Sequence, residues 1–283
     1  MSHTILYGSI AALVALVLIW RFSYWYGEGR KLVRDGYLPP NPTFFGQLAL
    51  RSISKLMCKL FIGPIKVIDR SNARFNGRLN ILPNHQFPLD FMVVASALPY
   101  GYRHLGTVSE MKNPLRATLS AFAGFFAVNT EGGKAQSGGQ AVVEACGKCL
   151  GLHRKSRLLM FPQGKLVQDN VLRPEDFRTG AIRAMHAARD HFGCPTETLA
   201  VLPMAVHYKR DPKDANWFHK LVVALGWKSF RKFKYYDETA TNYGAVVVIG
   251  RPIPLADLPE DPREAIEVVR REIDKLLTVA KSS

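Results

Sequence analysis

The residues best suited to chemistry lie in a short segment, Asn-His-Gln-Phe-Pro-Leu-Asp, at positions 84–90. His85 and Asp90 are five positions apart and follow an apolar run typical of a strand, 79–82. Pro88 suits the first position of a helix, where its missing N–H would have no helical partner. Asp90 would then be the third helical residue, with its carboxylate pointing back toward His85. A carboxylate that orients an imidazole makes a general base for a hydroxyl proton. The alternative is that Asp90 only caps its helix and His85 is an ordinary loop histidine.

A second polar loop, Pro-Gln-Gly-Lys at positions 162–165, follows another apolar run, 158–161. Ligands of open α/β sheets bind outside the carboxyl ends of strands, so we expect this loop and the His85 loop to share one cleft. Gln163 would present an amide there and Lys165 a cation.

These two loops need a sheet to position them, and the rest of the chain predicts one. Apolar runs typical of strands occur at 65–68, 79–82, 104–108, 125–128, 158–161, 199–206 and 245–249. Helical patterns occur at 89–98, 115–123, 135–153, 180–191 and 263–280. This alternation predicts an α/β fold in which helices flank a central, mostly parallel sheet.

The front of the chain predicts membrane-anchoring helices. Residues 5–26 contain one charge, Arg21, and are long enough to span a bilayer if that side chain reaches the headgroups. Aromatic residues cluster at one end of this segment, as in an interfacial belt. The positive charges follow the apolar segment, which favours a retained anchor with the catalytic domain on the cytoplasmic face over a cleaved signal peptide. The alternative is a buried helix of a soluble protein.

A second helix is predicted to lie on the membrane. Residues 36–42 have the composition of a linker, and residues 45–61 then repeat apolar side chains at helical spacing. Arg51, Lys55 and Lys59 form a basic stripe on the other side, which suits the interface of an anionic membrane. The alternative is a helix that packs on the domain and solvates its basic face. The domain plan is therefore an anchor at 1–35, a linker and interfacial helix at 36–60, and an α/β domain at 61–283.

The composition of the chain limits the classes of binding partner that we expect. Among 283 residues, 38 Lys and Arg against 23 Asp and Glu give a formal charge of +15, which favours anionic lipid, phosphorylated substrates or an acidic carrier protein. The chain has no recognisable nucleic-acid-binding module, so we expect no nucleic acid partner. Four scattered cysteines do not form a disulfide scaffold and fit a reducing compartment. Cys146, Cys149 and His153 offer three local metal ligands where a structural zinc takes four, so helix packing is the favoured interpretation and no metal is predicted.

Several motifs, taken in order, resemble those of the lysophospholipid and glycerolipid acyltransferases, the PlsC-like family. Asn-His-x4-Asp at 84–90 resembles the first motif, and residues 108–129 are similar to the next region. Phe-Pro-Gln-Gly at 161–164 looks like the family's Phe-Pro-Glu-Gly motif. The Phe-Arg-Thr-Gly-Ala segment at 177–181 resembles a following turn, and Val-Leu-Pro-Met at 201–204 matches the last strand motif. The order and spacing of these motifs make the resemblance specific, and it covers residues 61–250.

The resemblance implies an O-acyltransferase of phospholipid biosynthesis that moves a fatty acyl chain from acyl-CoA or acyl carrier protein to a lysolipid hydroxyl. The leading acceptor is 1-acylglycerol-3-phosphate. His85 would be the catalytic base, and Asp90 would fix its tautomer and stabilise the imidazolium. No covalent acyl-enzyme, no cofactor and no metal is implied. Backbone N–H groups at the start of the helix that contains Asp90 are expected to stabilise the oxyanion.

The chain departs from the family pattern at two positions that the family associates with the phosphorylated acceptor. Gln163 replaces the usual Glu, and Asn129 replaces the usual Arg. Lys165 would supply a point charge in place of a guanidinium. The alternatives are therefore another lysolipid, a glycolipid or a lipophilic alcohol as acceptor, or a non-catalytic lipid-binding membrane protein. The residues predicted to bind substrate are Asn84, Gln163, Gly164, Lys165 and Arg178.

Overall fold

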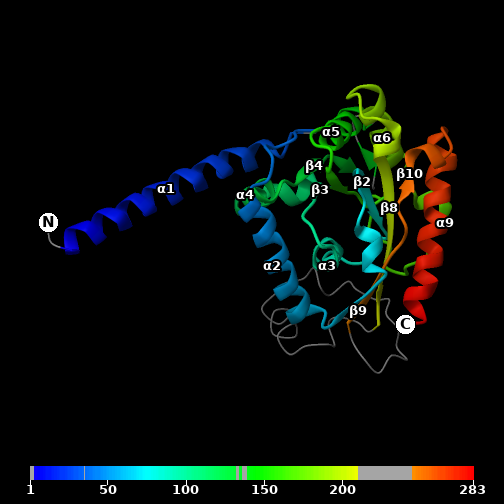
Figure 1. The fold of residues 1–283 in the computed structure, drawn as a ribbon, viewed down its shortest axis with the longest axis horizontal. Helices are drawn as coiled ribbons and strands as arrows, with labels where there is room; N and C mark the ends of the chain where they lie inside the picture. The colour runs from blue at the N-terminus through cyan, green and yellow to red at the C-terminus, as the bar shows by residue number, and fades with distance from the viewer. Residues whose placement is uncertain (1–2, 35, 132–133, 136–138, 210–243) are drawn as a thin grey trace.

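The structure is a computed structural model that describes residues 3–34, 36–131, 134–135, 139–209 and 244–283. Its centre is an eight-stranded sheet with the order β1-β9-β8-β2-β7-β3-β4, and β10 pairs with β8 (Figure 1). All pairs along this order are parallel except β8 with β9, and β10 is antiparallel to β8. The strands are β1 (Ile65–Ile68), β2 (Arg78–Pro83), β3 (Arg103–Thr107), β4 (Phe126–Val128), β7 (Arg157–Leu159), β8 (Leu199–Tyr208), β9 (Ala245–Ile249) and β10 (Ile253–Pro254).

Helices cover both faces of this sheet. They are α1 (His3–Lys31), α2 (Phe44–Phe61), α3 (Asp90–Ala97), α4 (Pro114–Ala123), α5 (Gln140–Gly151), α6 (Gly180–Asp190) and α9 (Pro262–Lys281). One hydrophobic core joins the sheet to α4, α5, α6 and α9, and a second joins it to α2 and α3. A small hairpin of β5 (Thr130–Glu131) and β6 (Lys134–Ala135) stands apart from the main sheet. The predicted α/β fold with a mostly parallel sheet between helices is confirmed.

The central strands are apolar because both faces of the sheet are covered. Nine of the ten residues of β8 are buried, as are all five of β9. A strand covered on both sides reads as a continuous apolar run instead of an alternating one. This is why the sequence located β9 well: the predicted run 245–249 coincides with it. The predicted run 65–68 coincides with β1, which is only partly buried.

Element boundaries near the predicted site differ from expectation. Pro88 is not the first residue of a helix: it lies in a turn, and α3 begins at Asp90, which is therefore the first helical residue and not the third. The turn is closed by the Asp90 N–H, which donates to the Phe87 carbonyl at 3.0 Å. The helix predicted from residue 135 begins at Gln140, because Ala135 belongs to β6, and residues 136–138 lie outside the described residues.

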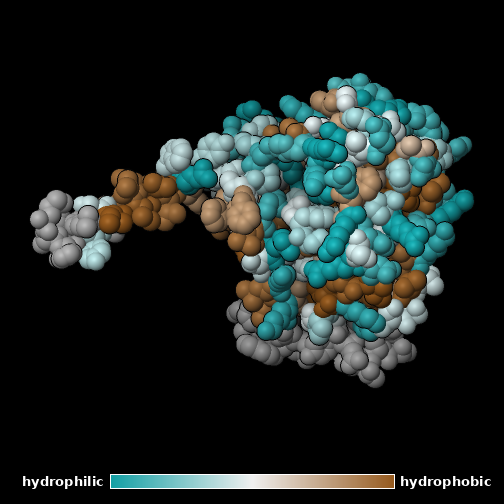
Figure 2. Space-filling view, in the orientation of Figure 1, coloured by the Kyte–Doolittle hydropathy of each residue, from teal (hydrophilic) through white to brown (hydrophobic). Residues whose placement is uncertain are grey.

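The start of the chain forms a long helix that leaves the domain (Figure 1). Its end is fixed by Trp25, which is buried and makes an edge-to-face contact with Phe122 at the end of α4. Further toward the N-terminus, large apolar side chains of α1 are exposed, and Figure 2 shows them as a hydrophobic stretch of the projecting helix. A transmembrane span is not supported: within the described residues, no helix combines the length and apolar character needed to cross a bilayer.

The second helix, α2, packs on the domain through one face and exposes another that is apolar. Gly46, Ser54, Cys58 and Phe61 are its buried residues. The exposed apolar residues of α2 are Phe44, Phe45, Leu48, Ile53 and Leu56, and the side chains of Lys55 and Lys59 are also exposed. The helix therefore contacts the domain core, as the alternative interpretation predicted. It also presents an apolar and basic surface that the domain does not cover.

Candidate active site

The predicted pair of His85 and Asp90 is formed. β2 ends at Pro83, the chain turns at the carboxyl edge of the sheet, and α3 begins at Asp90, which brings the carboxylate under the imidazole. The Nδ1 atom of His85 lies 3.0 Å from Asp90 Oδ2. Asp90 is fully buried, whereas 19% of the His85 side chain is exposed. A buried carboxylate therefore orients a ring that still reaches the surface of the site.

The carboxylate of Asp90 accepts hydrogen bonds at both oxygens. Oδ2 accepts from the backbone N–H of Gln86 at 2.6 Å and of Phe87 at 2.8 Å, in addition to its contact with His85. Oδ1 accepts from the hydroxyl of Tyr208, the last residue of β8, at 2.5 Å. Hydrogen bonds to a carboxylate stabilise its charged form, so the buried charge of Asp90 is compensated by neutral donors.

The backbone of His85 is held by the loop that follows β7. Gln163 is buried, and its Oε1 accepts from the His85 N–H at 2.7 Å. The Val167 N–H donates to the His85 carbonyl at 2.7 Å. The two loops therefore meet at one edge of the sheet, as predicted. The oxygen of Gln163 is occupied by the protein itself, and its Nε2 is buried without a hydrogen-bond partner among the described residues.

An aromatic residue fixes the imidazole plane. Phe161 stacks on His85, with ring centroids 3.8 Å apart and an interplanar angle of 15°. The other neighbour of Phe161 is His104 of β3, whose ring meets it edge-on with the centroids 5.6 Å apart. His104 is buried among aromatic rings, and this burial lowers its pKa to about 3, with a further lowering from the nearby His85. His104 is therefore neutral beside the site.

Asn84, which was predicted to bind substrate, is buried and forms hydrogen bonds with two other segments of the chain. Its amide donates to the Val206 carbonyl at 2.9 Å and to Asn170 Oδ1 at 2.6 Å. Its own Oδ1 accepts from the Val206 N–H at 2.7 Å. The side chain therefore fixes the His85 loop to β8 and to the loop after β7, and these contacts account for its polar atoms.

The other three predicted binding residues lie in the loop after β7. Gly164 has a φ of +64°, a left-handed conformation that favours glycine, and closes a turn onto the Phe161 carbonyl. Lys165 pairs with Asp176, at 2.5 Å between Nζ and Oδ1. Arg178 donates its backbone N–H to the Pro162 carbonyl at 2.8 Å, and its buried Nε has no hydrogen-bond partner among the described residues.

With the geometry described, relatives can be compared. The profile of the Acyltransferase family matches residues 64–207, which is more than half of the chain. The chain belongs to the Acyltransferase family. Among solved structures it is similar in fold to the 1-acyl-sn-glycerophosphate (LPA) acyltransferase PlsC from Thermotoga maritima, with a TM-score of 0.51 and 13% identity over 81% of this chain and 79% of that one. No curated protein sequence gives a significant match.

Family membership makes the protein an acyltransferase, an enzyme that takes an acyl donor and a lipid acceptor, and sets aside the non-catalytic alternative. The PlsC-like resemblance deduced from the motifs is confirmed. The match spans the His85 loop, the loop after β7 and almost all of β8. The residues that contact His85 therefore belong to the matched region, and Tyr208, which contacts Asp90, lies one residue beyond it.

The expected role of backbone N–H groups near the start of α3 in stabilising an oxyanion stays a prediction. Several of these N–H groups are engaged within the loop itself. The Gln86 and Phe87 N–H groups bind Asp90, and the N–H of Asp90 binds Phe87. The N–H of Met92, one turn into the helix, binds the Leu89 carbonyl. The N–H groups of Gln86 and Phe87 thus hold the Asp90 carboxylate in place.

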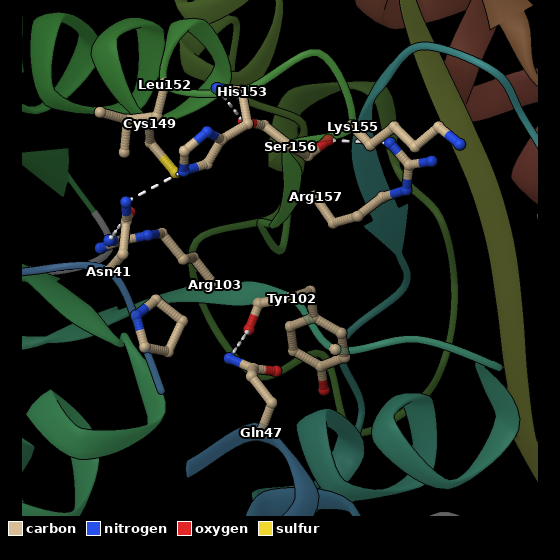
Figure 3. A pocket seen from close by; sticks show the side chains of 12 residues that line it. Asn41, Gln47, Tyr102, Arg103, Cys149, Leu152, His153, Lys155, Ser156 and Arg157 are labelled. Atoms are coloured by element: carbon tan, nitrogen blue, oxygen red, sulfur yellow. Dashed lines mark hydrogen bonds between the residues drawn. The ribbon is translucent and has the colours of Figure 1, made fainter. Parts of the chain in front are cut away.

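A cavity of about 270 Å³ lies elsewhere in the acyltransferase, at the amino ends of β3 and β7 (Figure 3). Because β2, β3 and β7 are parallel, this is the edge of the sheet opposite His85. Arg103 lines it but donates to the Pro39 carbonyl and to Asn41, and Arg157 donates to backbone carbonyls including that of Phe75. The guanidinium groups of Arg103 and Arg157 therefore hold segments of the chain together through hydrogen bonds. Cys146 and Cys149 are buried in the nearby core, and no group of three or more metal-binding side chains occurs in the described ranges.

Several residues that surround His85 and Asp90 were not predicted from the sequence. Tyr208 and Phe161 touch Asp90 and His85 directly, and Asn170 fixes Asn84. Phe161 stands in a recognised motif but was interpreted only as part of a strand. Tyr208 lies two residues beyond the predicted end of its strand, where no local pattern distinguishes it from an ordinary core tyrosine.

Proposed function

We propose that this enzyme transfers a fatty acyl chain from the thioester of acyl-CoA or acyl carrier protein to the hydroxyl of 1-acylglycerol-3-phosphate. The observation that carries the proposal is the contact between His85 Nδ1 and the buried carboxylate of Asp90. A carboxylate only accepts hydrogen bonds, so Nδ1 carries the proton and Nε2 is the nitrogen that remains to act as base. The stacked Phe161 keeps the ring in that orientation.

The reaction follows from these positions. Nε2 of His85 takes the proton from the acceptor hydroxyl as its oxygen bonds to the thioester carbonyl carbon. Asp90 stabilises the imidazolium that forms. The tetrahedral intermediate collapses, the carbon–sulfur bond breaks, and the thiolate receives the proton from the imidazolium. An ester and a free thiol result, with no acyl-enzyme and no metal-dependent step.

The cation proposed to bind the acceptor phosphate is Arg178. Lys165 and Arg173 already face carboxylates, at 2.5 Å from Asp176 and Asp169 respectively. Arg178 forms no ion pair among the described residues, and its backbone is bonded to the turn that holds His85. A guanidinium can bind a phosphate through two parallel hydrogen bonds. Lys165, which the sequence suggested for this role, forms an ion pair with Asp176.

We further propose that the enzyme works at a membrane surface, with the domain on the cytoplasmic face. Support comes from the exposed apolar residues of α1 and from those of α2, where Phe44 and Phe45 are 76% and 72% exposed beside Lys55 and Lys59. A helix with exposed apolar and basic side chains can lie in the interface of an anionic bilayer. Vesicle flotation tests this: Phe45→Ser with Leu48→Ser should reduce binding to anionic vesicles, whereas Val279→Ser on α9, also exposed, should not.

The activity is tested with the full chain in anionic vesicles, with acyl-CoA and a panel of lysolipids, read by mass spectrometry of the products. We expect acylated lysophosphatidate from the wild type and none from His85→Ala. Arg178→Gln should raise KM for lysophosphatidate about tenfold or more, because a charged hydrogen bond is lost, and leave KM for a neutral monoacylglycerol unchanged. Acylation of only neutral acceptors would instead favour a glycolipid or lipophilic alcohol as the natural acceptor.

A further inference from the structure

Tyr208 is the buried tyrosine that joins the central sheet to the catalytic carboxylate. It is the last residue of β8, is fully buried, and packs edge-to-face against Phe87 of the His85 loop. Its hydroxyl donates to Asp90 Oδ1 at 2.5 Å. A residue from the middle of the sheet therefore reaches the carboxylate from the side opposite to the imidazole.

The two oxygens of Asp90 have different partners. Oδ2 faces the N–H groups of Gln86 and Phe87 and the Nδ1 atom of His85, all within 3.0 Å. Oδ1 faces the Tyr208 hydroxyl. A partial rotation of the carboxylate about its Cβ–Cγ bond would move the accepting oxygen out of line with His85 Nδ1, whereas a full exchange of the two equivalent oxygens would restore the same contacts. A donor on Oδ1 opposes the partial rotation, because turning would leave a buried oxygen without its hydrogen bond.

We propose that Tyr208 is a positioning residue of this acyltransferase, which holds Asp90 so that Oδ2 keeps His85 in the tautomer with a free Nε2. The inference rests on the proposed role of His85 as base. Tyr208 acts through Asp90 and does not touch the substrate. Burial, and then the adjacent Asp90, raise the pKa of Tyr208 well above its usual value, so the hydroxyl keeps its proton and remains a donor.

A purely structural role would look different, and the chain offers a matched control. Tyr102 is also buried, and its hydroxyl donates to the carbonyl of Phe91, the residue after Asp90 in α3. Tyr102→Phe and Tyr208→Phe each remove one hydroxyl that donates a hydrogen bond to the first turn of α3. If the two hydroxyls only brace α3, both variants lose the same stability and the same activity.

The kinetic test compares these two variants with the wild type. Tyr208→Phe should lower kcat about 10–100-fold, the factor expected for a lost hydrogen bond to a charged group, with KM for the lysolipid unchanged. Tyr102→Phe should keep kcat within about fivefold, the effect of a neutral hydrogen bond. In an Asp90→Asn background, Tyr208→Phe should have no further effect on kcat, because the residue acts through that carboxylate. Equal losses in both tyrosine variants, or an independent effect in the double variant, would overturn the proposal.

A second measurement does not depend on turnover. The nitrogen-15 chemical shifts of His85 report which ring nitrogen carries the proton. The wild type and Tyr102→Phe should hold the proton on Nδ1, whereas Tyr208→Phe should show a mixture of tautomers. An unchanged tautomer in Tyr208→Phe would overturn the inference even if the enzyme is active. If instead no lysolipid is acylated by the wild type, the proposed function fails while the tautomer still decides the role of Tyr208.

Discussion

Two histidines pack against the same phenylalanine and have opposite environments. His85 stacks face to face on Phe161, contacts the carboxylate of Asp90 and is partly exposed. His104 meets Phe161 edge-on, is buried between further aromatic rings, and its Nδ1 has no hydrogen-bond partner among the described residues. His85 therefore has a carboxylate partner and a partly exposed ring, whereas His104 is buried and has no carboxylate partner within the described ranges.

The comparison shows that residue type and proximity do not make a general base. Burial disfavours the charged form of His104 and lowers its pKa to about 3, so this ring cannot hold a proton during turnover near neutral pH. His85 instead contacts the Asp90 carboxylate, which in the proposed mechanism stabilises the imidazolium. Each prediction below alters one side of this contrast.

The largest effect is expected from removal of the base. His85→Ala should lower kcat about 10³–10⁴-fold, the upper range for a lost acid–base group, in an assay of thiol release from acyl-CoA. His153→Ala, a change at an exposed loop histidine, is the matched control and should leave kcat unchanged. Comparable activity in His85→Ala and the wild type would end the assignment of His85 as base.

Loss of the charge that orients His85 should lower kcat less than loss of His85 itself. Asp90→Asn should lower kcat about 10²–10³-fold while KM for the lysolipid changes little, because the defect lies in orienting and charging His85. The variant also places an amide opposite the Gln86 and Phe87 N–H groups, so thermal unfolding is measured alongside. Equal losses in kcat and acceptor affinity would point to a capping role for Asp90.

The buried histidine should make the fold sensitive to acid. The unfolded chain protonates this ring below pH 6.5, whereas the folded protein does so only near pH 3. Stability is therefore complete above pH 6.5 and falls as the pH drops toward 3, by about tenfold in the folding equilibrium per pH unit. His104→Phe should reduce this decline in denaturant titrations between pH 7 and pH 4.5. An identical decline in both proteins would show that His104 is not the cause.

Removal of the hydrogen bond between Gln163 and the His85 backbone should have an intermediate effect, on stability. Gln163→Ala leaves the His85 N–H without its acceptor and should lower the free energy of unfolding by about 1–3 kcal/mol. Gln168→Ala, in the same loop, is the control because its side chain makes no hydrogen bond with the described residues. If the two variants are equally stable, Gln163 has a role in substrate binding and not in holding the loop.

The smallest effect is expected at Lys165, which faces Asp176 with nearly half of its side chain exposed. Lys165→Ala should change stability by at most about 1 kcal/mol and kcat/KM by less than about fivefold. If KM for lysophosphatidate rises strongly in this variant and is unchanged in Arg178→Gln, Lys165 and not Arg178 binds the acceptor phosphate.

The sequence located the elements of the fold because their signals are local. The buried strand β9 is an unbroken apolar run, and the amphipathic pattern of α9 follows an Asp-Pro start. Boundaries at the site were less predictable. Pro88 has the chemistry of a helix start but lies in a turn, because the Asp90 carboxylate already caps the N–H groups of Gln86 and Phe87.

The residues at the site divide in the same way. His85 and Asp90 were predicted from spacing, because five positions of chain place both on one loop. Asn84 and Gln163 were predicted to bind substrate; the structure shows Asn84 bonded to β8 and the Gln163 oxygen bonded to the His85 backbone. The partners of a side chain that reaches across strands depend on which strands become neighbours, and that order is not written in any short segment.

By itself, the sequence determined the α/β class, the family and the contact between His85 and Asp90, since each depends on residue types a few positions apart. Only the tertiary structure decided that Tyr208 supports Asp90, that Lys165 is paired with Asp176, and that His104 is a neutral neighbour of the base. The physical reason is that burial and long-range hydrogen bonds set the charge and orientation of a side chain, and both exist only once the sheet is assembled.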